Sequence, residues 1–404
     1  MLRAALASLA LILCGAIGAA RAAEPATAMI VADQVSLRAE PRSTARQQAV
    51  LWQGEMVEVR GERLDYLQVY DYRRERGGFV HASNVRRLRL TAEEAPELLS
   101  IVRFVRETPG AEALGIGYAM AYIQAAPADS VRGETGVEAL DALGTFADRL
   151  ARRASAGAAQ GKAEAAALSA HLDVAARYGV KFTNSERKGR MRICYDGDAF
   201  RRVLAMRSTP EQRARAVLGL TRHECVSPDL GPLERHRLDE WRADVLDRVD
   251  AAALPGYLMN RVLMRRAGVW GSLAFQRARL GEAADTAAQR ALTELSTINK
   301  SDLTDADLTA YNDAAMRVNA SRWAAMPAPA PAVPKRVHIV TAPGEPGETC
   351  VSLMDAKQQQ GAGSPLARRC TYGIVWTGSA SLNREGNAIA LAVQPLDAWR
   401  EMWI

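Results

Sequence analysis

The sequence predicts a multidomain α+β protein with a small β-barrel, a large all-α domain and a small C-terminal antiparallel β segment. Short alternating apolar runs fill residues 29–90, apolar residues recur at helical spacing over 91–326, and β-like alternation returns over 335–404. A proline-rich stretch at 327–334 separates the last two regions. The chain has 404 residues, and at roughly 150 residues per domain this length also favours several domains.

Residues 1–22 have the pattern of a cleavable export signal. A basic Arg3 precedes an apolar run from Leu6 to Ile17, and Ala20 and Ala22 form a small-residue cleavage site. The run is shorter than the ~20 residues that a membrane-spanning helix needs, and no later stretch comes close to that length. We therefore expect a periplasmic or secreted protein with no transmembrane helix in the mature chain.

The charge of the chain argues against a nucleic-acid partner. The formal net charge is +6, and basic residues are interspersed with acidic ones throughout. A nucleic-acid footprint needs a basic stripe with interleaved aromatic residues, and none is present. A solvated surface of mixed sign is the expected arrangement.

Residues 29–90 predict a small barrel of short strands. Apolar residues alternate in the stretches "VSLRAEP", "LWQGEMVEV", "YLQVYD" and "GGFVHASNVRRL", with proline and glycine turns between them. In their order these stretches resemble the bacterial SH3-like (SH3b) domain, whose members read L-x-V-R-x-G-P, K-G-x-x-V-x-V, G-W-x-x-V and G-W-V. Three positions depart from that pattern: Glu40 replaces a glycine, and Tyr66 and Phe79 replace tryptophans. The resemblance implies the fold but leaves the ligand open.

The aromatic residues of this region are the ligand-binding candidates. They stand beside Arg73, Arg74 and Arg76, in a chain that is only 6% aromatic. We expect about half of the rings to fill the barrel interior and the others to form a groove edged with positive charge, which suits glycan–peptide or acidic ligands. The candidates are Trp52, Tyr66, Tyr70, Tyr72 and Phe79.

The region 91–326 predicts a helical domain. Thr91 and Glu94 form a capping-box pattern ahead of the periodic apolar residues that begin at Leu98. Residues 179–198 interrupt the pattern and mark either a boundary between subdomains or a short hairpin. Further helices are expected at 111–125, 137–156, 163–178, 199–206, 210–223, 233–253, 257–280, 282–298 and 305–326.

The C-terminal part predicts a spacer followed by a small sheet. The proline-rich residues 327–334 cannot continue a helix and should form a semi-rigid polyproline II spacer. Strands are expected in "RVHIV", "TCVSLM", "CTYGIVWTGSASL" and "NAIALAVQPL", with a hairpin loop at 383–386. So small a sheet needs a disulfide or packing against the helical domain to be stable.

Export would remove Cys14 and leave four cysteines for an oxidising compartment. Four cysteines allow three pairings, and we favour Cys194 with Cys225 and Cys350 with Cys370, because each pair falls within one predicted domain.

No residue set identifies a catalytic or metal site. His223 and Glu224 resemble the start of a zinc-binding helix, but Ser227 stands where the second histidine should be. Asp196 and Asp198 lack the other ligands of a calcium loop and are expected to cap a helix. We therefore expect no metal and no cofactor.

The same residues give little support to two classes of enzyme. A cysteine hydrolase needs a free thiolate, and all four mature cysteines are assigned to disulfides. A lytic glycosidase needs a carboxyl group with a raised pKa, for which Glu134 and Glu282 are the candidates, although each is better explained as a first-turn acid.

These observations favour a non-enzymatic binding or scaffolding protein of the cell envelope. Its SH3-like module would contact peptidoglycan or a partner protein. The alternative is a peptidoglycan-active hydrolase whose catalytic residues lie in the helical domain, in which case a deep cleft with a buried carboxyl or histidine is expected there.

Overall fold

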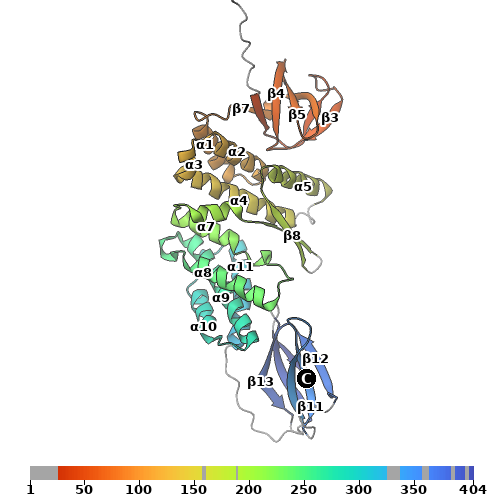
Figure 1. Cartoon of the computed structure of the whole chain (residues 1–404), viewed down its shortest axis with the longest axis vertical. Coiled ribbons are helices and arrows are strands. Elements are labelled where there is room, and N and C mark those ends of the chain that lie inside the picture. The colour runs from red at the N-terminus through yellow and green to blue at the C-terminus, as the bar shows by residue number, and fades with distance from the viewer. Residues whose placement is uncertain are drawn as a thin grey trace, which may run out of the picture. The chain divides into compact units, whose positions relative to one another are not determined.

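The protein combines helices with several antiparallel sheets, as a computed structural model shows (Figure 1). The structure describes residues 26–156, 161–187, 190–324, 337–356, 364–383, 387–395 and 400–404. The expected export signal, the spacer at 327–334 and loop residues 384–386 lie outside these ranges. The chain divides into two compact units, one that ends at Glu94 and one that begins at Ala95.

The first unit contains a seven-stranded antiparallel sheet of order β3-β2-β6-β5-β4-β1-β7. The pairings leave β3 and β7 at its edges, so they do not by themselves close the barrel that the sequence predicts. The strands are β1 (Ala26–Ile30), β2 (Val35–Arg38), β3 (Gln47–Leu51), β4 (Met56–Arg63), β5 (Tyr66–Asp71), β6 (Arg76–His81) and β7 (Val85–Leu88).

Aliphatic side chains alone form the buried core of this sheet. Alternate residues of each strand point inward, and the core includes Ile30, Leu37, Leu51, Val69 and Val80. None of the five candidate aromatic residues is fully buried, so the expectation that about half of them fill the interior is wrong. Branched aliphatic residues from neighbouring strands already fill so small a space, and the rings remain at the surface.

A buried ion cluster fastens the turn after β5 to the turn before β4. Arg74 donates hydrogen bonds to Glu55 at 3.1 Å, to Asp71, and to the carbonyl of Val50 at 3.2 Å. The Glu55 side chain is 2% exposed. Burial raises the pKa of Glu55, and the hydrogen bond and charge of Arg74 oppose that rise.

Replacing Arg74 with methionine is expected to lower the free energy of unfolding of this unit by about 2 kcal/mol, because the Glu55 carboxylate would remain buried without its cation. The loss should shrink at acidic pH. Without Arg74 the folded-state pKa of Glu55 rises further above its unfolded value, so the folded state binds a proton more readily as the pH falls. Urea unfolding at neutral and acidic pH tests this, and an equal loss at both values would contradict it.

The second unit begins with helices that largely match the expected ones. They are α1 (Ala95–Arg106), α2 (Glu112–Ala125), α3 (Ala128–Arg132), α4 (Glu134–Ala156), α5 (Lys162–Arg177), α6 (Asp198–Ala205), α7 (Pro210–Leu220), α8 (Pro232–Asp247), α9 (Gly256–Leu280), α10 (Asp285–Ser296) and α11 (Asp305–Ala324). Helix α4 packs against α2, and α9 packs against α8, α10 and α11 (Figure 1).

Several helix ends differ from expectation; the helix expected at 233–253, for example, ends at Asp247 and is followed by a separate 3₁₀ turn at Ala251–Ala253. The Glu94 carboxylate accepts hydrogen bonds from the N–H groups of Arg89 and Leu90, both at 2.8 Å, rather than serving a capping box with Thr91. Helix α7 ends at Leu220 rather than at residue 223, and the next residues form a short 3₁₀ turn, η3 (His223–Cys225). At its start α7 has a complete capping box between Thr209 and Gln212.

A hairpin and two small sheets complete the second unit. The interruption at 179–198 is a hairpin of β8 (Phe182–Arg187) and β9 (Arg190–Tyr195), which resolves the alternative left open by the sequence. The C-terminal strands form the sheets β10-β11-β12 and β13-β14-β15. Their bounds are β10 (Val337–Pro343), β11 (Thr349–Asp355), β12 (Ala367–Thr371), β13 (Ile374–Leu382), β14 (Ile389–Gln394) and β15 (Glu401–Trp403).

Both expected disulfides are confirmed. Cys194 of β9 is bonded to Cys225 of η3, with Cα atoms 5.7 Å apart. Cys350 and Cys370 face each other on β11 and β12 and are bonded across the two strands. The two bridges fit an oxidising compartment.

Among the described helices, none is both long and apolar enough to span a membrane.

Candidate functional site

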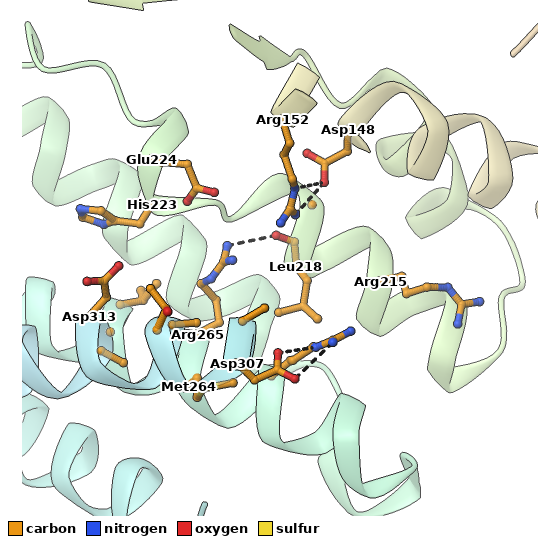
Figure 2. Close-up of a pocket in the computed structure, with 18 of the residues that line it drawn as sticks. Asp148, Arg152, Arg215, Leu218, His223, Glu224, Met264, Arg265, Asp307 and Asp313 are labelled. Atoms are coloured by element: carbon orange, nitrogen blue, oxygen red, sulfur yellow. Dashed lines mark hydrogen bonds and ion pairs between the residues drawn. The ribbon is translucent and has the colours of Figure 1, made fainter. Parts of the chain in front are cut away.

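The helical part of the second unit contains a cavity of about 860 Å³. Residues from α4, α7, η3, α9 and α11 line it, and Figure 2 shows Arg152, Glu224 and Arg265 around a common space while Arg215 points away from them. A volume of this size is typical of sites for small organic ligands. The cleft expected for an enzyme in this domain is therefore present. The charges and pKa values of its lining side chains indicate which reactions or ligands it suits.

Local structure positions each wall of the cavity. The disulfide to Cys194 ties η3, which carries His223 and Glu224, to strand β9. The hydroxyl of Thr304 accepts a hydrogen bond from the N–H of Asp307 at 3.2 Å and caps the start of α11. Phe200 of α6 also lines the cavity and packs directly against α4 and α7.

Two glycines make that packing of Phe200 possible. A Cβ atom added at Gly144 of α4 would lie 2.4 Å from the Phe200 ring, and one added at Gly219 of α7 would lie 2.3 Å from it. Real side-chain atoms do not approach so closely, so only glycine allows both helices to contact the ring. Both Phe200 and Gly219 line the cavity.

The lining of the cavity is strongly basic. Among the described residues, eight arginines and four carboxylates line it. The carboxylates belong to Asp148, Glu224, Asp307 and Asp313. Several of the arginines are held by ion pairs: Arg261 binds Asp307 through two hydrogen bonds, at 2.8 and 3.2 Å, and Arg152 binds Asp148 at 2.7 Å.

Arg265 lies at the centre of the cavity and, unlike Arg261 and Arg152, forms no hydrogen bond to a carboxylate of the described residues. Its Nη1 donates to the main-chain carbonyl of Leu218 at 3.0 Å and to the hydroxyl of Thr221 at 3.4 Å, so its hydrogen-bond partners are neutral (Figure 2). Burial lowers the pKa of Arg265 to about 10; the charge of Glu224 opposes this shift, and the charges of Arg242 and Arg152 add to it. Positive charge is therefore incompletely compensated at this point.

Glu224 is the carboxylate that faces Arg265, and its environment is unsuited to acid catalysis. Burial would raise its pKa, but Arg222, which donates a hydrogen bond at 2.9 Å, and Arg265 outweigh that effect and lower the pKa to about 2. A glycosidic general acid needs the opposite shift. Glu224 is ionised at every physiological pH.

The carboxylates proposed for a lytic enzyme do not line this cavity. Glu134 lies in the first turn of α4, and Glu282 is exposed just after the end of α9. Asp196 accepts a hydrogen bond from the N–H of Asp198 at 3.0 Å in the turn before α6. The N-cap of α6 is Gly197, in the left-handed conformation and without a side-chain cap, so the expectation that Asp196 or Asp198 caps this helix is wrong.

The described residues include one group of three potential metal ligands, formed by Glu348, Cys350 and Cys370. Both of its sulfur atoms belong to the disulfide, so they offer no thiolate. His223 and Glu224 lie in a 3₁₀ turn rather than on an α-helix. The zinc-binding motif that they resemble needs an α-helix to place its ligands on one face, so this turn does not fit it.

Most of the aromatic candidates gather on one face of the first unit. Tyr66 and Tyr70 of β5 and Phe79 of β6 occupy outward positions, since their immediate neighbours Leu67, Val69, Gly78 and Val80 are buried. Phe79 is paired in register with Gln68, and Tyr66 makes an edge-to-face contact with His81 at 5.3 Å. Trp52 lies apart from these strands, in the turn after β3.

An arginine covers one end of this aromatic face. The guanidinium of Arg60 lies 3.8 Å from the centre of the Tyr70 ring, and the Tyr72 ring packs edge-on against Tyr70 at 5.0 Å. Glu58 accepts hydrogen bonds from Arg60 and from the Tyr72 hydroxyl, both at 2.9 Å. The neighbouring arginine is thus Arg60, whereas Arg74, which the sequence suggested, belongs to the buried cluster.

The arginines of the cavity were missed by sequence reasoning because they come from separate helices. One signal was available: Arg149 and Arg152 are three residues apart, and Arg261 and Arg265 are four apart. Such spacings place two guanidinium groups on the same face of a helix.

The sequence matches no protein-family model, and neither the curated proteins nor the solved structures that were searched contain a match.

Proposed function

We propose that this protein is an exported, non-enzymatic binding protein of the cell envelope, and that its first unit is an SH3-like module that contacts peptidoglycan through the face formed by Tyr66, Tyr70, Tyr72 and Phe79. The observation that carries the proposal is the position of these rings. The aliphatic core leaves Tyr72 exposed and the other three rings partly exposed, and these three lie on the adjacent strands β5 and β6.

The composition of this face supports a glycan–peptide ligand. Aromatic rings stack on the apolar faces of sugars, and an adjacent guanidinium binds carboxylates of the peptide part. Arg60 lies over Tyr70, and a ligand carboxylate would share its guanidinium with Glu58, which accepts a hydrogen bond from it at 2.9 Å.

The hydrolase alternative has weaker support. A cleft exists in the helical part, but the pKa of its Glu224 is lowered to about 2, and both cysteine pairs are oxidised. A general acid or a thiolate nucleophile needs the reverse of these conditions.

Replacing Tyr66 and Phe79 together with alanine is expected to reduce retention of the full chain on purified peptidoglycan sacculi by at least about tenfold, because two partly exposed rings of the proposed face are lost. Co-sedimentation measures retention, and the same supernatants are analysed for soluble fragments. The core residues are untouched, so thermal unfolding of the variant should change little.

Tyr372→Ala is the matched control, because it removes a ring that is 59% exposed in the C-terminal part of the chain. It should leave retention unchanged. Equal retention of the double variant and the wild type would refute the proposed face, and release of soluble fragments by the wild type would favour the hydrolase.

A further inference from the structure

We propose that the arginine-lined cavity of the second unit is a binding site for a small anionic ligand, whose carboxylate or phosphate group pairs with Arg265. This inference does not depend on the function proposed for the first unit. It assigns to the helical part a role that the aromatic face does not supply.

The charge of the lining selects an anion. Eight arginines face four carboxylates, an excess of four positive charges in the lining itself. Asp141 and Asp239, which lie behind the lining, neutralise Arg215 and Arg242 and leave part of this excess in place. Charges in a partly enclosed space are screened less by salt than charges on an open surface, so an anion that enters the cavity gains more there.

The guanidinium of Arg265 can bind an anion with donors that it does not use within the protein. A guanidinium carries five N–H donors in a planar fork, which matches the two oxygens of a carboxylate or phosphate. Within the described residues, only Nη1 of Arg265 has hydrogen-bond acceptors, and both of these are neutral. The remaining N–H donors of Arg265, which lies among the labelled side chains of Figure 2, are the ones that a ligand would use.

The neighbouring ion pairs hold the surrounding arginines in place. Asp307 fixes Arg261 through two hydrogen bonds, and Asp148 fixes Arg152 at 2.7 Å. These guanidinium groups are therefore already ordered when a ligand binds, which lowers the entropic cost of binding.

Aliphatic residues complete the lining and set the kind of ligand. Leu258, Met264 and Ala310 line the same cavity. A ligand of about this volume would place its acidic group on Arg265 and an apolar portion on these side chains. Bare inorganic ions should bind more weakly than organic anions for the same reason.

The test uses two probes with the full chain. Isothermal titration calorimetry with citrate and with pyrophosphate, at low ionic strength, separates a carboxylate site from a phosphate site. We expect saturable one-to-one binding of at least one probe, weakened at least about tenfold by Arg265→Gln. Arg265→Lys keeps the charge but loses the fork, and should bind with intermediate affinity.

The control removes the same charge elsewhere. Arg248 is 70% exposed at the end of α8 and does not line the cavity, so Arg248→Gln should bind the probe as the wild type does. If Arg265→Gln does not fold, as judged by circular dichroism, Arg152→Gln replaces it, because its side chain is 55% exposed.

Two outcomes would overturn the proposal. One is the absence of saturable binding of either probe up to about 10 mM. The other is equal affinity of the wild type and Arg265→Gln. Retention on sacculi should be unaffected by Arg265→Gln, so failure of this inference is distinguishable from failure of the function proposed for the first unit.

Discussion

Replacing Asp239 with leucine is expected to lower the free energy of unfolding of the helical part by about 3 to 5 kcal/mol. Asp239 is fully buried on α8 and accepts hydrogen bonds from Arg242 at 2.7 Å and from the Ser272 hydroxyl at 2.6 Å. Burial lowers the pKa of Arg242, and Asp239 is the main influence that opposes this. Without Asp239 a guanidinium that is 2% exposed would lose its carboxylate partner.

Asp244→Ala on the same helix is the matched control. Asp244 pairs with Arg248 at 2.6 Å, but both side chains are more than half exposed. Pairs of this kind contribute between about 0 and 1 kcal/mol. Urea unfolding followed by circular dichroism compares the free energies of unfolding of the two variants. Similar losses for both would contradict the larger contribution assigned to the buried pair of Asp239 and Arg242.

Replacing Cys194 and Cys225 with serine is expected to lower the free energy of unfolding by roughly 3 to 4 kcal/mol, because the bridge closes a loop with a sequence separation of 31. The same change should weaken ligand binding in the cavity, since the bridge holds η3 with Glu224 against β9. Chemical denaturation and calorimetry with the probe ligand measure the two effects.

The double variant of Cys350 and Cys370 separates these effects. It removes a bridge with a sequence separation of 20 between β11 and β12, outside the cavity lining. It should destabilise the C-terminal sheet and leave probe binding unchanged. Loss of binding in this variant as well would show that the cavity does not depend specifically on the Cys194 bridge.

Local patterns predicted much of the secondary structure. Thr209 and Pro210 mark the start of α7, because a capping hydroxyl and a fixed φ angle act within one turn. Alternation in "YLQVYD" placed β5, since period-two burial is a property of a single strand. The disulfide partners also followed from the domain in which each cysteine lies.

Features that depend on tertiary packing were not predictable in this way. Glu94 accepts hydrogen bonds from the N–H groups of Arg89 and Leu90. These bonds form because the chain turns just before α1, and the local sequence does not specify that turn. The rings at Tyr66 and Phe79 stay outside because aliphatic residues from other strands take the interior. The cavity brings Arg152, Arg215 and Arg265 together from three helices, and no spacing along the chain contains that information.

The contact between Phe200 and the glycines of α4 and α7 acts as a spacer for the cavity. A phenyl ring is rigid, so the distance between these helix backbones is set by the size of the ring rather than by the balance of charges around it. Salt should therefore change how strongly the cavity attracts an anion without changing its width. A larger residue at either glycine would separate the two helices and move Arg152 away from Arg215. The cavity would then select ligands of a different size, while the charge of its lining would stay the same.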